Sequence, residues 1–152
     1  MNVSKLCIVG EAGVGKTTLV RLLSEKQMDS VRKPTIGVAV ERVEFENDAL
    51  AVWDLAGQKR FQFMWDEFMR GSKLTVIVTD STTKNVEETK AIVDRIRARE
   101  GAKIIAIANK QDLAGRMNPE QIQNRLGVPT FGMVAVERGN EDMLRDILLR
   151  NI

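Results

Sequence analysis

The stretch from Leu6 to Leu23, LCIVGEAGVGKTTLVRLL, decides how the chain folds. It begins with a short apolar run and passes through a glycine-rich turn. It then continues into a segment where Leu19, Leu22 and Leu23 recur at helical spacing. A continuous apolar run without polar alternation is typical of a strand covered on both faces of a parallel sheet. The stretch therefore predicts a buried strand, a glycine-rich loop and a helix, in that order.

The loop between this strand and helix, Gly10–Thr17, matches the pattern G-x-x-x-x-G-K-[ST]. Its glycines let successive backbone N–H groups point at a phosphate, and the following helix adds its positive end. Lys16 is expected to neutralise phosphate charge and the Thr17 hydroxyl to bind Mg²⁺. A chance match in a glycine turn is the alternative, but the strand and helix stand where the motif requires them. The residues predicted to bind the phosphates are Gly13, Val14, Gly15, Lys16, Thr17 and Thr18.

The rest of the chain repeats the alternation of apolar strands and amphipathic helices. Leu74–Thr79 and Ile104–Ala108 are further continuous apolar runs, and helical patterns occupy residues 86–99 and 143–148. Alternating apolar and charged residues around Val43, followed by Ala49–Trp53, predict a hairpin that adds an antiparallel edge strand. These patterns predict a three-layer α/β fold.

The composition excludes several classes of function. The chain of 152 residues fits one domain, residues 1–152, and its net charge of +2 gives no reason to expect nucleic-acid binding. It has no His and no Tyr, which excludes Ser-His-Asp catalysis, His-ligated metals and phenol chemistry. Its single cysteine, Cys7, cannot form an intrachain disulfide, which is typical of a reducing compartment.

The sequence shows no targeting signal. Asn2 stands where myristoylation requires glycine, and the chain ends without a prenylatable cysteine. No apolar stretch approaches the ~20 residues that span a bilayer. We therefore expect a cytoplasmic protein with no direct lipid anchor.

A second motif, Asp54-Leu-Ala-Gly57-Gln58, directly follows the strand that ends at Trp53. A carboxylate at that strand end can hold Mg²⁺ through a water molecule, the Gly57 N–H can reach a γ-phosphate, and Gln58 can orient an attacking water. Taken alone, this pattern is usually a simple turn. Beside a phosphate loop it predicts a metal-binding carboxylate, a phosphate-binding glycine and a catalytic glutamine.

Two further loops complete the predicted site. Thr35, within Pro34–Gly37, could close onto the metal when a γ-phosphate is present, and a plain turn is the alternative. Asn109-Lys-Gln-Asp112 follows the third apolar run. The Asp112 carboxylate offers acceptors that match the N1–H and N2–H₂ donors of guanine, a donor pair that adenine lacks. Asn109 would brace this loop and the Lys110 stem would cover the base; a helix N-cap by Asp112 is the alternative.

Together these motifs resemble those of the Ras-like small GTPases. GEAGVGKT, PTIG, DLAGQ and NKQD stand in that family's order and near its spacing. The resemblance implies a P-loop GTPase domain with a six-stranded, mostly parallel sheet, one antiparallel edge strand and about five helices. It implies GTP or GDP and Mg²⁺ as ligands, with Thr17, Thr35 and Asp54 holding the metal. Gln58, Lys16 and Thr35 are the implied catalytic residues, and activating proteins, exchange proteins and an effector are the implied partners.

The chain departs from this family's pattern at several points. The last guanine loop of the family usually reads Ser-Ala-Lys, and the matching segment here is Val134–Val136. The Ala135 N–H is expected to bind the guanine O6, with Val136 beside it. Met28 stands nearest to an aromatic residue that packs on the base, and Ala12 replaces a common glycine. With no C-terminal lipid signal and a trimmed length, the chain resembles prokaryotic members of the family, a resemblance that does not establish its source.

Aromatic residues that follow the D-x-x-G-Q motif predict a partner surface. Phe61 and Trp65 are four residues apart and would share one helix face, whereas Met64, Phe68 and Met69 would pack on the core. Exposed aromatic residues often mark binding sites. Phe61 and Trp65 are therefore the expected effector contacts.

The main interpretation is a molecular switch that hydrolyses GTP to GDP. Hydrolysis should be slow without a partner, because no arginine of the sequence occupies an obvious position beside the γ-phosphate. The alternative is a nucleotide-stabilised scaffold with negligible turnover. A P-loop kinase or ATPase is a third interpretation, which the guanine-type NKQD motif disfavours.

Overall fold

Six strands form one sheet in the computed structural model of the protein, which describes residues 2–24, 38–44, 48–57, 59–99, 101, 103–134 and 140–152. The strands are β1 (Asn2–Val9), β2 (Val38–Glu44), β3 (Asp48–Leu55), β4 (Leu74–Thr79), β5 (Ile104–Ala108) and β6 (Thr130–Gly132). Their spatial order is β2-β3-β1-β4-β5-β6. All neighbouring pairs are parallel except β2 and β3, which are antiparallel. The predicted mixed sheet with one antiparallel edge strand is confirmed.

β1 lies between two parallel neighbours, which explains its apolar sequence. Leu6 is in register with Val52 of β3 on one side and with Leu74 of β4 on the other. All three side chains are buried in the same hydrophobic cluster. The strand is longer than the predicted apolar run, because it also includes the more polar residues Asn2–Lys5.

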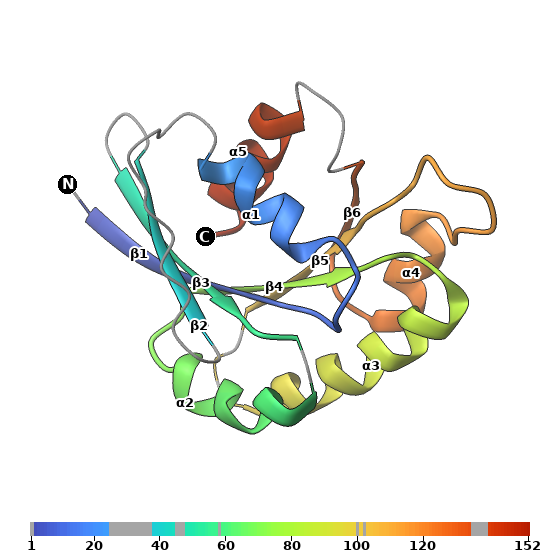
Figure 1. The fold of residues 1–152 in the computed structure, drawn as a ribbon, viewed down its shortest axis with the longest axis horizontal. Helices are drawn as coiled ribbons and strands as arrows, with labels where there is room; N and C mark the ends of the chain where they lie inside the picture. Colours follow the sequence, from blue (N-terminus) through green and yellow to red (C-terminus); the bar gives the residue numbers. More distant parts are fainter. Residues whose placement is uncertain are drawn as a thin grey trace.

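Helices cover both faces of the sheet (Figure 1). α1 (Lys16–Ser24) and α5 (Asn140–Asn151) pack on one face, where the first hydrophobic cluster lies. α2 (Trp65–Phe68), α3 (Thr83–Arg97) and α4 (Pro119–Leu126) pack on the other face against a second cluster. The described residues thus form the three-layer α/β fold with five α-helices that the sequence and its resemblance predict. Among these described helices, none is long and apolar enough to cross a lipid bilayer.

Local sequence signals explain where α3 and α4 begin and where α4 ends. The Thr82 hydroxyl accepts a hydrogen bond from the Asn85 N–H at 3.2 Å and caps α3. Asn118 and Gln121 form a reciprocal capping box at the start of α4. Gly127 ends α4 with φ of +74°, a left-handed conformation that favours glycine. These caps fix the two helices that flank the carboxyl ends of β4 and β5.

A surface ion pair joins α3 to α4. The Nε and Nη2 groups of Arg125 donate hydrogen bonds to the two carboxylate oxygens of Glu87 at 2.7 and 2.6 Å. The hydrogen bond from Arg125 lowers the pKa of the Glu87 carboxyl below its ordinary value. This bidentate geometry holds the two helices side by side on the same face of the sheet.

The segment that leads into α2 differs from its prediction. Lys59–Met64 form a 3₁₀ helix, η1, and α2 itself is a single turn of four residues. Trp65 is 1% exposed, and its indole N–H donates a hydrogen bond to the Ala56 carbonyl at 3.1 Å. The prediction that Trp65 is an exposed partner contact is therefore wrong. A 3₁₀ helix has three residues per turn, so side chains before Trp65 do not keep the α-helical phase on which the prediction rested.

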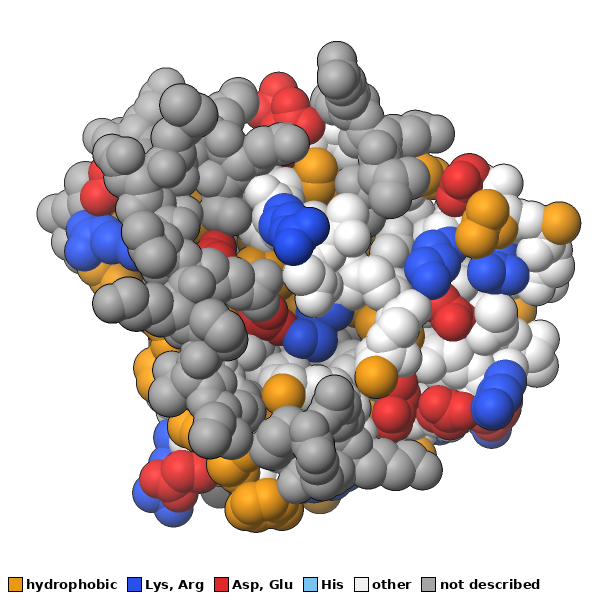
Figure 2. All heavy atoms as spheres, viewed as in Figure 1, with side chains coloured by type: hydrophobic (Ala, Val, Ile, Leu, Met, Phe, Trp, Pro, Cys, Tyr) orange, Lys and Arg blue, Asp and Glu red, His pale blue; other side chains and the backbone are white. Residues whose placement is uncertain are grey.

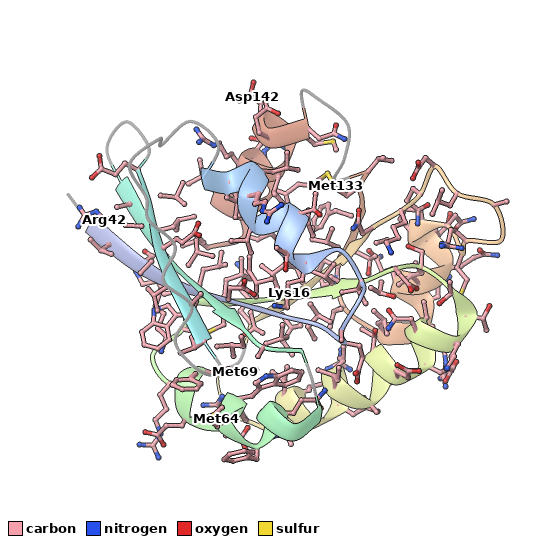
Figure 3. All side chains as sticks on the ribbon, in the orientation of Figure 1. Lys16, Arg42, Met64, Met69, Met133 and Asp142 are labelled. Atoms are coloured by element: carbon pink, nitrogen blue, oxygen red, sulfur yellow. The ribbon has the colours of Figure 1, made fainter. Side chains whose placement is uncertain are left out.

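The other side chains of this segment divide between core and surface. Met69 is buried and Phe68 is half-buried against the second hydrophobic cluster, as predicted, whereas Met64 is only half-buried (Figure 3 labels both methionines). Phe63 is 75% exposed. The side chain of Phe61 lies outside the described part of the chain, so its role as a partner contact stays a prediction.

Candidate functional site

The predicted motifs meet at one edge of the sheet. β3, β1, β4 and β5 are consecutive parallel strands, so their carboxyl ends point to the same side. The phosphate loop follows β1, Asp54 lies near the end of β3, and Asn109 directly follows β5. In Figure 1 the phosphate loop joins the end of β1 to α1 beside the carboxyl ends of β4 and β5. The sheet topology therefore places three separate motifs around one site.

The phosphate loop has the backbone geometry that its glycines allow. Gly13 and Gly15 have φ of +86° and +91°, in the left-handed region where a side chain is strained. At Gly15 the packing is also close, because a Cβ there would lie 2.3 Å from the side-chain nitrogen of Asn109. Gly13 has no such neighbour within 4 Å. The backbone conformation thus favours glycine at both positions, and close packing also requires it at Gly15.

Lys16 and Asp54 form an ion pair beneath the phosphate loop. The Lys16 ammonium donates to Asp54 Oδ1, and the two side chains are only 11% and 4% exposed. Figure 3 shows Lys16 between α1 and the sheet. The residues predicted to contact phosphate and metal therefore lie together, although they are far apart in the sequence.

The loop of residues 109–112, called the base loop, is hydrogen-bonded directly to the phosphate loop of residues 10–17. The side-chain amide of Asn109 donates to the Val14 carbonyl at 3.0 Å, and the Lys110 ammonium donates to the Gly13 carbonyl at 3.0 Å. The hydrogen bond to Val14 is thus a contact through which Asn109 could brace the loop, as predicted. Asp112, the predicted guanine-selecting residue, is exposed at the end of the same turn. Its carboxylate is accessible to a ligand lying over this loop.

Gly57 lies against the phosphate loop from the opposite side. A Cβ at this position would lie 2.2 Å from the Gly10 carbonyl oxygen, a contact that backbone atoms cannot relieve cheaply. Only glycine fits at residue 57 without displacing one of the two segments. The backbone of the D-x-x-G-Q motif therefore lies beside the loop predicted to hold phosphates.

Comparison with known proteins agrees with this geometry. The sequence model of the ADP-ribosylation factor family matches residues 2–141. The chain belongs to the ADP-ribosylation factor family. ADP-ribosylation factor J of Dictyostelium discoideum is 34% identical over 127 residues, which are 81% of this chain and 67% of that protein. ADP-ribosylation factor-like protein 5 of Caenorhabditis elegans is 33% identical over 132 residues, which are 84% of this chain and 73% of that protein.

The ADP-ribosylation factor family is a branch of the Ras-like small GTPases, so the predicted resemblance is confirmed and narrowed. Both of these relatives come from eukaryotes. They give no support to the expectation of a prokaryotic member without lipidation.

Several residues that the family resemblance assigns to the site lie outside the described part of the chain. They are Met28, Thr35, Gln58, Ala135 and Val136. Their assigned roles stay predictions. Val134, the one described residue of the Val134–Val136 segment, accepts a hydrogen bond from the Asn140 side chain at 2.6 Å.

The described residues predicted to hold Mg²⁺ fit that ion in chemistry. The Thr17 hydroxyl and the Asp54 carboxylate are hard oxygen donors, which Mg²⁺ prefers. Thr17 is exposed in the first turn of α1. Asp54 contacts Lys16, the residue directly before Thr17. Mg²⁺ is usually held by one or two protein oxygens together with phosphate oxygens. Thr17 and Asp54 therefore suit a metal ion that binds together with a phosphate ligand.

The charges of this family member are mixed on the face seen in Figure 2. Among the described residues there, Lys and Arg side chains alternate with Asp and Glu side chains, with no continuous basic patch. This distribution agrees with a net charge of only +2. It gives no support to nucleic-acid binding at this face.

A buried polar network behind the base loop was not predicted from the sequence. The Thr79 hydroxyl donates to Asn85 Oδ1 at 2.6 Å, and the Ser81 hydroxyl donates to the Asn109 carbonyl at 2.7 Å. One signal could have indicated it, since Asp80-Ser81-Thr82 follows an apolar strand just as the other motifs do. Polar residues at the carboxyl end of a parallel strand lie at the same edge as the site.

Proposed function

We propose that the protein is a GTP-binding molecular switch that hydrolyses GTP to GDP with Mg²⁺. The observation that carries the proposal is the direct bonding of the base loop to the phosphate loop. Asn109 and Lys110 contact the carbonyls of Val14 and Gly13, so a base and its phosphates would be held by one connected unit. Membership of a small GTPase family supports the same activity.

Guanine selectivity is assigned to Asp112. Its exposed carboxylate follows the two residues that contact the phosphate loop. A carboxylate accepts hydrogen bonds from N1–H and N2–H₂ of guanine, and adenine does not present this pair of donors. ATP should therefore bind far more weakly than GTP.

Phosphate and metal binding are assigned to the first turn of α1 and the end of β3. Lys16 neutralises phosphate charge, while Thr17, Asp54 and Thr35 would hold Mg²⁺. When bound, Mg²⁺ would neutralise part of the charge that develops on the phosphate oxygens. The ion pair between Lys16 and Asp54 supports this assignment, because it places both groups beside the phosphate loop.

Hydrolysis is assigned to Gln58, which would orient the attacking water. Orientation alone leaves much of the transition-state charge without a partner, and an arginine supplied by another protein is worth about 10³–10⁵ in rate. We therefore propose slow hydrolysis by the protein alone and faster hydrolysis with an activating protein. A separate exchange protein would release GDP.

Two measurements test this function. Competition of GTP and ATP for the GDP-loaded protein should show displacement by GTP at far lower concentration. Single-turnover phosphate release should be slow, and slower still in Gln58→Leu, which should bind GTP as the wild type does. Gln123→Leu, at a glutamine on α4, is the matched control and should keep the wild-type rate. Equal displacement by ATP would refute guanine selectivity, and absence of phosphate release would favour the scaffold interpretation.

A further inference from the structure

Two residues with unusual backbone conformations lie in segments that a hydrogen bond joins, one after β4 and one in the base loop after β5. Ser81 and Lys110 have φ of +70° and +61°, and they are the non-glycine residues in the left-handed region among those that the structure describes. Such conformations are uncommon for residues other than glycine and persist where the surroundings hold them. One hydrogen bond connects the two segments: the Ser81 hydroxyl donates to the carbonyl of Asn109, the residue directly before Lys110. This geometry couples the end of β4 to the base loop.

Ser81 is the centre of that coupling. Its side chain is 0% exposed, and its hydroxyl donates to the Asn109 carbonyl at 2.7 Å. Its own N–H donates to the Thr79 hydroxyl at 3.2 Å, and its carbonyl accepts from the Met117 N–H at 2.8 Å. Ser81 therefore contacts segments both before and after the base loop.

Gln111 completes the connection from within the loop. Its side-chain Nε2 donates to the Ser81 hydroxyl at 2.8 Å and to the Met117 carbonyl at 3.0 Å. The hydroxyl of Ser81 is thereby used as both donor and acceptor. The side chain of Gln111 thus contacts Ser81 and Met117, whereas its neighbours Lys110 and Asp112 are predicted to contact the ligand.

The position of Asp112 depends on this arrangement. Asp112 lies inside a turn in which the Leu113 N–H donates to the Lys110 carbonyl at 3.1 Å. The turn is held on one side by the Lys110 ammonium on Gly13 and on the other by the Gln111 side chain. The Gln111 backbone N–H also donates to the Met133 carbonyl at 3.3 Å, so loss of the Gln111 side-chain contacts would loosen the turn without releasing it.

We propose that Ser81 and Gln111 are positioning residues that set guanine selectivity by fixing the turn that carries Asp112. The proposal rests on the proposed guanine-nucleotide function and names residues that act through Asp112 without touching the ligand. One hydrogen bond contributes about fivefold to an equilibrium constant. Removing the side-chain contacts of Ser81 or Gln111 should therefore weaken the recognition of the base more than the recognition of the phosphates.

The test compares GDP with inosine diphosphate, which lacks the 2-amino group that Asp112 is proposed to accept from. Dissociation rates of both nucleotides are measured for the wild type, Gln111→Met and Ser81→Ala. Gln111→Met keeps the length of the side chain and removes its donors. It should accelerate GDP release about fivefold and inosine diphosphate release by less, so that the preference for GDP shrinks. Ser81→Ala should change the preference in the same direction.

Gln123→Met is the matched control. Gln123 also uses its side-chain amide to bond a backbone group, accepting from the Thr130 N–H at 3.0 Å at the start of β6. Its substitution should leave the preference for GDP unchanged. Should Ser81→Ala fail to fold, Gln111→Met carries the test, because its side chain is only half-buried.

The outcomes separate this inference from the function on which it rests. A wild type that retains neither nucleotide overturns the proposed function. A wild type that prefers GDP, with variants that release both nucleotides faster by the same factor, overturns the positioning role and leaves the function intact. Unchanged release from Gln111→Met also overturns the positioning role.

Discussion

The ammonium group of Lys16 lies against the carboxylate of Asp54, 38 residues further along the chain. These are the two charges that the proposed function assigns to phosphate and metal. In the described conformation they neutralise each other in a nearly buried position. Binding a nucleotide with Mg²⁺ would replace this pairing by contacts of Lys16 with phosphate and of Asp54 with the metal shell.

Replacing Lys16 tests both sides of this relationship. Lys16→Met should reduce GDP affinity by orders of magnitude, because phosphate charge loses its partner. It should also destabilise the protein by about 3 kcal/mol, because the buried carboxylate of Asp54 loses the positive charge of Lys16. Isothermal titration with GDP and urea unfolding measure the two effects.

The double variant Lys16→Met with Asp54→Asn is the control for this prediction. It removes both charges, so most of the lost stability should return while nucleotide binding stays lost. A double variant as unstable as Lys16→Met would show that the ion pair is not the source of the effect.

Gly15→Ala should destabilise the nucleotide-free protein more than Gly13→Ala. Both substitutions place alanine at a positive φ, which costs about 1–2 kcal/mol. The added methyl group at Gly15 also meets the side-chain nitrogen of Asn109 at 2.3 Å, whereas the one at Gly13 meets nothing within 4 Å. Both variants carry a similar backbone strain, so the difference between their free energies of unfolding in urea measures the cost of the contact with Asn109. Equal losses of stability would mean that Asn109 moves aside without cost.

Asp112→Asn should exchange guanine for xanthine selectivity. Asparagine presents an amide donor where the carboxylate accepted from the base, and xanthine carries an oxygen in place of the 2-amino group. Competition between GTP and xanthosine triphosphate measures the change. Retained preference for GTP would place the base pocket elsewhere.

Cys7 should react with thiol reagents only when the protein unfolds. The side chain is 0% exposed, and burial raises the pKa of its thiol above the ordinary value, although the hydrogen bond with Ser72 at 2.9 Å acts in the opposite direction. The lack of exposure and the raised pKa both slow the reaction of the thiol, since the thiolate is the reactive form. Labelling of this single cysteine should therefore follow the unfolding transition in urea. Rapid labelling in native buffer would contradict the packing of β1.

The ion pair between Glu87 and Arg125 should stabilise the protein only where Glu87 is ionised. Because the folded state lowers the pKa of this carboxyl, the contribution is present above the ordinary pKa and is lost as the pH falls through the folded value. Arg125→Met should therefore be less stable than the wild type at pH 7, by a small amount because the pair is exposed. In more acidic solution the two unfolding curves should converge. A difference that persists in acid would point to lost packing of the arginine stem.

The described architecture follows from patterns that are local in the sequence. Runs such as Leu74–Thr79 form buried strands because they contain no charged residue and are rich in Val, Ile and Leu. The charges that alternate around Val43 mark β2 as the edge strand, with its outward side chains exposed. The glycines of the phosphate loop and the ends of the strands likewise predict where the site lies, because strand polarity brings those ends together.

Features that depend on distant contacts could not be predicted in this way. The burial of Trp65 depends on η1 being a 3₁₀ helix and on the Ala56 carbonyl that its indole reaches. Ser81 belongs to none of the motifs that the sequence analysis used. Its importance arises from a contact with Asn109, 28 residues away. The Lys16–Asp54 pair combines two motifs that the sequence presents separately, and only the fold shows that their charges meet.

The contacts of Asn109 and Lys110 with the phosphate loop also have a consequence for the entropy of association. Hydrogen bonds that span 95 and 97 residues of sequence join the base loop to the phosphate loop. A ligand that meets a preorganised site loses less free energy to ordering of the protein. A nucleotide bound as proposed would therefore lose less free energy to the ordering of these two loops, because hydrogen bonds within the protein hold them together.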